Sequence, residues 1–256
     1  MTNCREIYDY INSYAPVNTQ EGFDNAGFLF GDKGREVKTA LLALDATSGV
    51  IAEAADKGAQ LIITHHPLIF HPLKNVLADN PVGRKIIALS KNDICVISMH
   101  TNLDKAAGGV NDILIKTLGA DKIEVAGESC PFMRVGYLEK EENLQDFLRR
   151  VKSNLKSNGL RYHDAGRPVR KIACLGGAGG GYLYDAFSLG CDTYVTSDIK
   201  YDTFLDAAEL GINLIDADHF CTENPVIFDL KNRLDKVFPD VSFIISERHC
   251  QTARFF

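Results

Sequence analysis

The sequence lacks the features that mark several classes of protein, beginning with a basic surface. No run of lysine and arginine occurs in its 256 residues, and acidic residues outnumber basic ones by 34 to 28, for a net charge of −6. Binding to a nucleic-acid backbone needs a basic face. We therefore expect no nucleic acid as the main partner, whereas a small anionic substrate held by local charges is compatible with this balance.

Long apolar runs are also missing. Runs such as LIIT are far too short to span a membrane. The segment MTNCREIYDYINSYAP has acidic and polar residues where a signal peptide needs apolar ones. We therefore expect no membrane association and a cytoplasmic location.

The cysteines show no pairing pattern. There are seven, an odd number, and no Cys-x-x-Cys occurs. Cys95 and Cys174 lie inside apolar runs, as reduced core thiols do, so we expect a reducing compartment. The composition is otherwise that of an ordinary globular protein, with 45% hydrophobic and 24% charged residues, and the length suits one large domain or two small ones.

Apolar strands and helices alternate along the chain with short connections. This order predicts an α/β fold with mostly parallel sheets. Strands are expected at residues 37–47, 60–64, 93–99, 132–138, 169–177, 192–198, 212–217 and 241–247. Helices are expected at residues 3–14, 48–59 with Ser48 as the N-cap, 81–92, 110–120, 141–155, 182–190, 202–211 and towards the end of 219–238, and residues 22–32 are expected to form turns.

The two halves of the chain resemble each other. Each has strand, helix, strand, helix, strand and then a histidine segment that enters a helix, which indicates an internal duplication. Asp45 lies 20 residues before His65, and Gly177 lies 20 residues before Ser197. Two similar three-layer halves related by a pseudo-two-fold axis would place a site between the carboxyl ends of their strands. The expected domains are residues 1–126 and 127–256.

The first candidate site motif is ITHHP, in which two adjacent histidines follow a predicted buried strand. Side chains of adjacent residues in an extended strand point in opposite directions. His65 and His66 could therefore bind one ion only if the chain turns there, as Pro67 allows, or each could serve a different ion. The alternative is a pair of partly exposed loop histidines.

Two further motifs follow predicted strands and place a carboxylate four residues after a histidine. They are His100 with Asp104 and His219 with Glu223, and helical spacing would bring each pair to one face. Taken alone, such a pair is more often an ion pair or a helix cap than a ligand set. The three motifs together supply four histidines and two carboxylates, which predicts a divalent-metal site.

The ligand types narrow the choice of ion. Imidazole and carboxylate without thiolate suit Zn, Mn, Fe, Co or Ni. Carboxylates can bridge two ions and neutral imidazole cannot, so the set favours a dinuclear centre with ions roughly 3.5–4 Å apart. Cys221 lies two residues after His219 and is expected to pack rather than to bind.

These motifs resemble those of the Nif-three-like dinuclear metal-centre family, also described as GTP cyclohydrolase I type 2-like. The resemblance runs through nearly the whole chain: FDNAGFLFGD, ITHHP, HTNLD, LGGAGGG and DHFCTE are each similar to a family motif. The short segment between the halves is typical of the compact form without an inserted middle domain.

The resemblance implies metal ligands at His65, His66, Asp104, His219 and Glu223. His100 would then be a catalytic residue near the ions. It also implies a homohexamer built as a trimer of dimers, with the metal sites facing an internal cavity. Three positions depart from the family pattern without removing a ligand: Ser197, Asp202 and Asp218.

Other residues are candidate substrate contacts. Gly177 and Gly179, in the glycine-rich turn, could offer N–H groups to a phosphate, or the turn is simply tight. The remaining candidates are Asp24, Asn25, Asp45 and Lys200, for which turn or cap roles are the alternative. His71, His163 and His249 are expected to be surface or loop histidines.

Two functions follow as hypotheses. The first is a metal-dependent hydrolase of a nucleotide or related heterocycle; the family resemblance implies GTP, with opening of its imidazole ring and release of formate. His100 could then shuttle protons. The alternative is a non-catalytic metal-binding scaffold or regulatory ring protein.

Overall fold

A computed structural model describes residues 1–127 and 130–254 and divides them into two compact units. Unit 1 comprises Met1–Ala107 and Ile227–Cys250, and unit 2 comprises Gly108–Val226 and the chain from Gln251 onwards. Residues 128–129, in the segment expected to connect the halves, lie outside the described residues.

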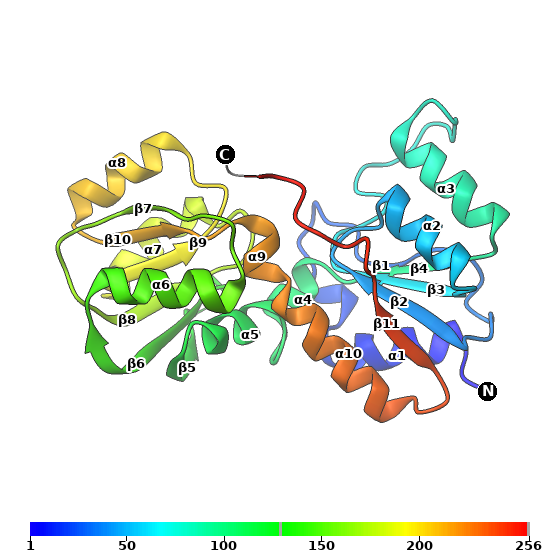
Figure 1. The fold of residues 1–256 in the computed structure, drawn as a ribbon, viewed down its shortest axis with the longest axis horizontal. Helices are drawn as coiled ribbons and strands as arrows, with labels where there is room; N and C mark the ends of the chain where they lie inside the picture. Colours follow the sequence, from blue (N-terminus) through cyan, green and yellow to red (C-terminus); the bar gives the residue numbers. More distant parts are fainter. Residues whose placement is uncertain (128–129, 255–256) are drawn as a thin grey trace. The chain divides into compact units, whose positions relative to one another are not determined.

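Unit 1 is built on a five-stranded sheet in the order β1-β4-β3-β2-β11 (Figure 1). All neighbouring strands are parallel except β1, which pairs antiparallel with β4. The elements are α1 (Cys4–Tyr14), the 3-10 turn η1 (Val17–Thr19), β1 (Gly27–Phe30), β2 (Thr39–Ala43), α2 (Ser48–Asp56), β3 (Leu61–Thr64), α3 (Pro81–Lys91), β4 (Cys95–Ser98), α4 (Thr101–Lys105), α10 (Pro225–Val237) and β11 (Ser242–Ile245).

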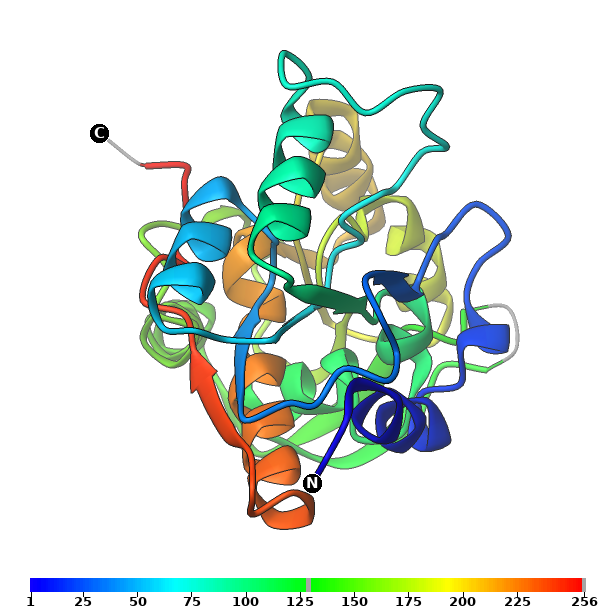
Figure 2. The same cartoon turned by 90° about the vertical axis from the view of Figure 1, so that its right-hand side faces the viewer.

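Both faces of this sheet are covered. On one face Leu41, Ile62 and Val96 pack against α2 and α3, and Figure 2 shows α1 and α10 on the opposite side. Because neither face meets water, every residue of β3 and β4 is buried. This explains why these strands consist of apolar runs ending in a polar residue.

Unit 2 is built on a six-stranded sheet in the order β5-β6-β8-β9-β10-β7. Only β8-β9 and β9-β10 are parallel, and the other three pairs are antiparallel. The elements are α5 (Val110–Thr117), β5 (Ala120–Val125), β6 (Arg134–Glu142), α6 (Leu144–Leu155), β7 (Arg161–His163), β8 (Val169–Cys174), the 3-10 turn η2 (Gly180–Tyr182), α7 (Leu183–Ser188), β9 (Thr193–Thr196), α8 (Tyr201–Leu210), β10 (Asn213–Asp216) and α9 (His219–Glu223).

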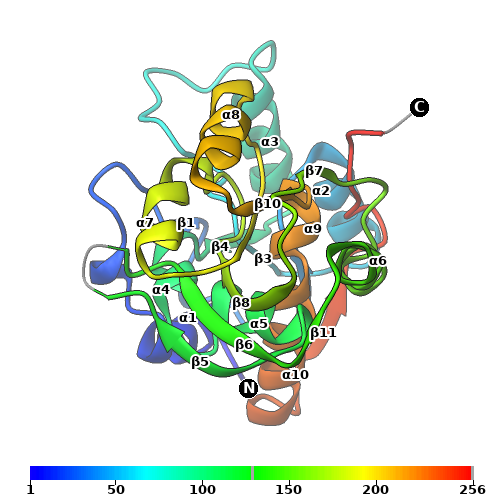
Figure 3. The ribbon, with the colours of Figure 1, turned by 90° about the vertical axis from the view of Figure 1, so that its left-hand side faces the viewer.

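The sheet of unit 2 also lies between two helical layers. Ile172, Val195 and Ile215 face a core shared with α5 and α6. The residues next to them, Ala173 and Tyr194, face a core shared with α7 and α8. Figure 3 shows these two layers on opposite sides of β8–β10.

The expected α/β class with two three-layer halves is confirmed, with four differences in detail. Residues 22–32, expected as turns, contain β1, and strands β5 and β7 were not expected. Thr47, rather than Ser48, is the N-cap of α2, because its hydroxyl accepts the N–H of Val50. The sheet of unit 2 is mixed rather than mostly parallel. The strand near the C-terminus, β11, belongs to unit 1, so the units do not follow the expected boundary at residue 126.

The order of elements repeats along the chain. Apart from the 3-10 turns, α1-β1-β2-α2-β3-α3-β4-α4-α5 is matched by α6-β7-β8-α7-β9-α8-β10-α9-α10. In both repeats the antiparallel strand, β1 or β7, comes before the three parallel strands and pairs with the outer side of the third of them, β4 or β10. The expected duplication therefore agrees with the topology. Each repeat ends in a helix and a strand that join the other unit, α5-β5 joining unit 2 and α10-β11 joining unit 1.

Candidate metal centre

The histidines that follow β3 and β4 form one cluster in unit 1. One ring nitrogen from each of His65, His66 and His100 lies within 4.8 Å of the others. The adjacent rings of His65 and His66 are 4.9 Å apart between centroids. They do not diverge as in a strand, because β3 ends at Thr64, whose hydroxyl donates to the carbonyl of His66.

All three rings are held at Nδ1 by an acceptor. The partners are the carbonyl of Met99 for His65 at 2.8 Å, the carboxylate of Asp45 for His66 at 2.9 Å and the carboxylate of Asp24 for His100 at 2.8 Å. Carbonyl and carboxylate oxygens accept, so Nδ1 carries the hydrogen and the neutral ring keeps its lone pair on Nε2. Metal-binding histidines are oriented in this way.

The carboxylate of Asp24 is ionised in this arrangement. Burial alone would raise its pKa, but hydrogen bonds from His100 and Thr101 outweigh that effect and lower the pKa to about 2. The same carboxylate accepts the backbone N–H of Thr101 at 3.0 Å. Asp24, a candidate substrate contact, therefore fixes both the ring of His100 and the start of α4.

Asp104 lies beside His65. Its Oδ1 is 3.6 Å from Nε2 of His65, which is fully buried. Two ligand atoms of one ion, each about 2.1 Å from it, lie roughly 3.0–3.5 Å apart, so the pair is close to the spacing of a shared cation. The donor set of nitrogen and oxygen atoms suits a divalent transition metal.

Unit 2 holds a second pair of donors on α9. Nε2 of His219 is 3.2 Å from Oε1 of Glu223, so the i, i+4 spacing does place both on one face, as expected. Nδ1 of His219 lies 2.7 Å from Oδ2 of Asp198. The fourth candidate histidine is therefore oriented by an acceptor in the same way as the other three.

The two His-x-x-x-carboxylate motifs differ by one residue relative to their helices. His100 is the N-cap of α4, whereas His219 is the first residue of α9 and Asp218 is its N-cap. Aligned by helix start, His100 corresponds to Asp218. Asp218 has φ 76, and its Oδ1 accepts the N–H of Cys221, which accounts for an acid where the family pattern has glycine.

Gly177 makes close approach to this pair possible. Its φ is +67, and a Cβ there would lie 2.3 Å from Oε1 of Glu223 and 3.2 Å from Nε2 of His219. The hydroxyl of Ser197 donates to the Gly177 carbonyl at 2.5 Å, so the departure at Ser197 secures the turn. Nothing in the structure explains Asp202 beyond its hydrogen bond to the N–H of Thr203.

The N–H groups of the glycine-rich turn donate within unit 2. Those of Gly176 and Gly177 donate to the side chains of Asn111 and Thr222, and that of Gly179 donates to the carbonyl of Gly177. A Cβ on Gly179 would collide with the hydroxyl of Thr196 at 2.2 Å. These contacts support the alternative of a tight, packed turn over a phosphate cradle.

The remaining candidates have varied surroundings. Asn25 donates from Nδ2 to the carbonyl of Ile69 at 2.6 Å, which ties its loop to the loop after His66. Lys200 is exposed at the N-cap of α8. Cys221 packs in the core of unit 2, as expected. His163 lies in edge strand β7 rather than in a loop.

Two residues near these clusters were missed by sequence reasoning. Asp198, the acceptor for His219, has φ 51 and lies two residues after the end of β9. Its place after β9, the strand that matches β3 of the first repeat, was the available signal. His249 lies in a loop, as expected, but it is half-buried and its Nδ1 accepts the N–H of Leu44. Burial lowers the pKa of His249 to about 4, so it stays neutral at physiological pH.

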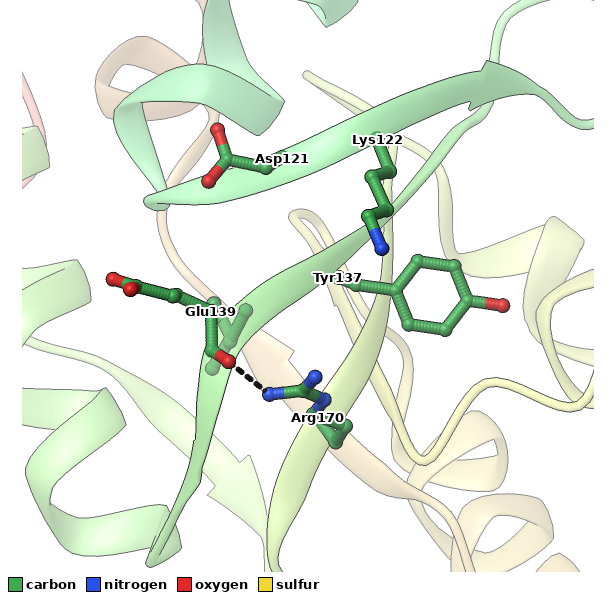
Figure 4. A pocket seen from close by; sticks show the side chains of 6 residues that line it. Asp121, Lys122, Tyr137, Glu139 and Arg170 are labelled. Atoms are coloured by element: carbon green, nitrogen blue, oxygen red, sulfur yellow. Dashed lines mark hydrogen bonds between the residues drawn. The ribbon is translucent and has the colours of Figure 1, made fainter.

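A separate hollow of about 460 Å³ lies on the sheet of unit 2. Figure 4 shows Lys122 and Tyr137 beside it, with Arg170 donating to the carbonyl of Glu139. Its six lining residues carry both signs of charge and include no histidine or cysteine, so this hollow has no resemblance to a metal centre.

No helix within the described residues is long and apolar enough to cross a membrane. Comparison with known proteins gives full-length relatives. A "GTP cyclohydrolase 1 type 2 homolog" of Clostridium perfringens is 40% identical over 249 residues, covering 94% of this chain and 95% of the relative. A Staphylococcus aureus hypothetical protein, SA1388, superposes with a TM-score of 0.91 at 30% identity, covering 99% of both chains.

A Bacillus cereus protein related to NIF3 has the same fold. Its TM-score is 0.91 at 26% identity, with 100% of this chain and 99% of that chain covered. Residues 2–251 also match the family described as Duf34/NIF3 (NGG1p interacting factor 3). The resemblance noted in the sequence motifs is thereby confirmed, and the chain belongs to the Duf34/NIF3 family.

Proposed function

We propose that this protein is a divalent-metal-dependent hydrolase that acts on a nucleotide or a related heterocycle. The proposed ligands are His65, His66 and Asp104 in unit 1 and His219 and Glu223 in unit 2, which together hold two ions of the Zn, Mn, Fe, Co or Ni type. The order of these residues along the chain follows the family motifs, and the spacings His65–Asp104 and His219–Glu223 support their assignment as ligands.

One observation carries the proposal. Nδ1 of every proposed histidine ligand is held by a carbonyl or carboxylate oxygen, at 2.7–2.9 Å. An acceptor at Nδ1 directs the Nε2 lone pair and makes the ring a stronger ligand. A histidine in a simple ion pair would need no such uniform orientation.

A pair of divalent ions, when bound, acidifies water and stabilises the charge that develops during hydrolysis. The chain then needs a group that moves a proton. His100 is placed for this, since Asp24 holds its Nδ1 and leaves Nε2 able to accept or donate. We assign Asp24 and Asp45 to positioning of His100 and His66, and we keep Asn25 and Lys200 as proposed substrate contacts.

The printed name of the Clostridium perfringens relative supports GTP as the first substrate to test. Protein purified without chelator should contain close to two divalent ions per chain by elemental analysis. It should release formate from GTP, and chelation should abolish this activity while Mn or Zn restores it. Full metal occupancy with no turnover across nucleotides and related heterocycles would favour the non-catalytic metal-binding scaffold, and metal content at background would reject the ligand assignment.

A further inference from the structure

Two phenylalanines lie exposed beside the histidine cluster of unit 1. Phe23 is 66% exposed and Phe70 is 37% exposed. Their ring centroids are 6.4 Å apart and the rings are tilted by 56°. Each ring therefore keeps apolar surface in water, at a cost that burial in a core would remove.

The two phenylalanine rings and the histidine rings form a row in which each ring lies next to another. The centroid of Phe70 is 6.0 Å from that of His100, and His100 is 5.2 Å from His65 and 5.6 Å from His66. The row thus runs from buried His65 through His100 and Phe70 to Phe23 at the surface. A molecule that covers the outer rings would have its attached groups next to the histidines.

The same hydrogen bonds that position the site also fix the two phenylalanines. Asp24, which holds His100, follows Phe23 directly in the chain. Ile69, whose carbonyl accepts the side-chain amide of Asn25, precedes Phe70 directly. The loop of Phe23 and the loop of Phe70 are therefore tied to each other and to the histidine cluster, as expected for a binding surface built ahead of its ligand.

We propose that Phe23 and Phe70 stack against the nucleobase of the substrate and so select a planar heterocycle. The inference rests on the proposed function, because the ions would attract the anionic part of the same molecule. Exposed aromatic faces bind bases by stacking, and this binding tolerates any base because every base has a π-face. The pair therefore selects nucleotides as a class, and guanine and adenine nucleotides both bind.

The sequence offers a clean probe, because the chain contains no tryptophan. Phe70→Trp and Phe23→Trp each introduce one fluorophore whose signal reports on that ring alone. Tyr162→Trp is the matched control: Tyr162 is 45% exposed, a fraction close to that of Phe70, and lies on edge strand β7, which contributes no proposed ligand or substrate contact. Guanosine, GTP, ATP and ribose 5-phosphate are titrated into metal-loaded protein.

Guanosine, GTP and ATP should quench the Phe70→Trp and Phe23→Trp signals saturably. Ribose 5-phosphate should not quench them, and none of these compounds should change the Tyr162→Trp signal saturably. By calorimetry, Phe70→Leu should bind GTP about tenfold more weakly, whereas Phe70→Tyr should bind it as the wild type does. Equal quenching by ribose 5-phosphate, equal quenching in Tyr162→Trp, or unchanged GTP binding by Phe70→Leu would each overturn the stacking role.

The metal content of each sample separates this inference from the proposed function. Guanosine carries no phosphate, so its stacking does not depend on the ions. Quenching by guanosine in a chain that binds no metal would support the aromatic surface and reject the hydrolase. Full metal content without quenching would reject the aromatic surface and leave the hydrolase standing.

Discussion

At the scale of single residues, two nearby acidic side chains have different roles. Glu223 is a proposed metal ligand, whereas Asp218 supports helix α9. Oε1 of Glu223 faces Nε2 of His219 at 3.2 Å, and the side chain is only 5% exposed. Asp218 instead caps α9 and accepts a hydrogen bond from Gln251. Both are acidic, but of the two we propose only Glu223 as a metal ligand, because it faces a histidine nitrogen.

Glu223→Ala should therefore lower the metal content from about two ions per chain toward one or none. If Glu223 were shared by the two proposed ions, its charge would offset part of their repulsion, so its loss would affect both. Elemental analysis of purified protein measures the change. Asp218→Asn is the control, because asparagine keeps the capping oxygen and tolerates φ 76, and it should keep both ions. The reverse pattern would show that the C-terminal ligands are wrongly assigned.

Gly177 and Gly181 give a second comparison, within one turn. An alanine at Gly177 would meet Glu223 at 2.3 Å in left-handed backbone, whereas nothing lies within 4 Å of a Cβ at Gly181. Gly177→Ala should destabilise the fold by at least about 1 kcal/mol from backbone strain alone. It should also reduce metal content, since Glu223 must move. Gly181→Ala should change neither the melting temperature nor the metal content. Equal effects of Gly177→Ala and Gly181→Ala would contradict the requirement for glycine beside Glu223.

At the scale of elements, the sequence predicts the buried strands and one edge strand, β11, and misses three other strands at sheet edges. β2, β3 and β4 are covered on both faces, so their apolar runs are unmistakable. β1, β5 and β7 each lie at the edge of a sheet. Only the first residue of β1 and of β5 is buried, and no residue of β7 is. β5 (ADKIEV) and β7 (RYH) are largely polar, whereas the apolar edge strand β11 (SFII) is predicted. β1 (GFLF) is apolar but short and lies between turn-forming residues.

In the candidate site, too, some features can be predicted from the sequence and others cannot. The types of the candidate ligands and their places after strands can be read from the sequence. The acceptors that orient the histidines cannot, because the carbonyl of Met99 is a backbone group and Asp198 lies 21 residues from His219. Local spacing cannot show contacts that arise when separate strand ends are brought side by side.

The buried Glu53 anchors the segment after β11 to α2. Its carboxylate accepts hydrogen bonds from the hydroxyl of Ser246 and from the N–H groups of Glu247 and Arg248. Burial raises the pKa of Glu53, but these bonds outweigh it and the pKa is lowered. The carboxylate is therefore the form that stabilises the fold.

Glu53→Gln should destabilise the protein by about 1–3 kcal/mol at neutral pH, because one accepting oxygen is lost from a buried group. The folded pKa lies below the unfolded one, so the contribution is present above the ordinary glutamate range and disappears as pH falls through the folded pKa. Denaturant unfolding should show the wild type and variant converging in acid. Glu247→Gln, on a side chain 81% exposed, should change stability by less than about 0.5 kcal/mol. A gap between wild type and Glu53→Gln that persists in acid would contradict this role.

At the scale of the whole molecule, the chain exchanges elements between its two repeats. α10 ends the second repeat and β11 follows it, but both belong mainly to unit 1, where β11 pairs in parallel with β2. The sequence shows two halves of similar pattern, so it suggests a boundary at their junction. Which sheet a terminal strand joins depends on the path of the chain in space, and no local pattern records it.

The last prediction concerns assembly. The family resemblance implies a homohexamer, and unit 2 has surface suited to self-association. α7 and α8 pack together and expose four large apolar side chains: Tyr184, Phe187, Tyr201 and Leu205. Exposed apolar side chains that lie together on neighbouring helices, unlike single exposed ones, are typical of protein interfaces. Light scattering at micromolar concentration should give about 169 kDa, six times the 28.2 kDa chain.

A charge placed on this surface of α7 and α8 tests whether the surface forms contacts between chains. Tyr201 is 77% exposed, so Tyr201→Glu should fold normally, and it should lower the measured mass because a carboxylate would be desolvated at a contact. Tyr162→Glu, on edge strand β7 at 45% exposure, is the control and should leave the mass unchanged. A monomeric wild type would contradict the expected hexamer. A hexamer that survives Tyr201→Glu would place the contacts on another face, since one buried and unpaired charge in each of six chains should cost more than such an interface tolerates.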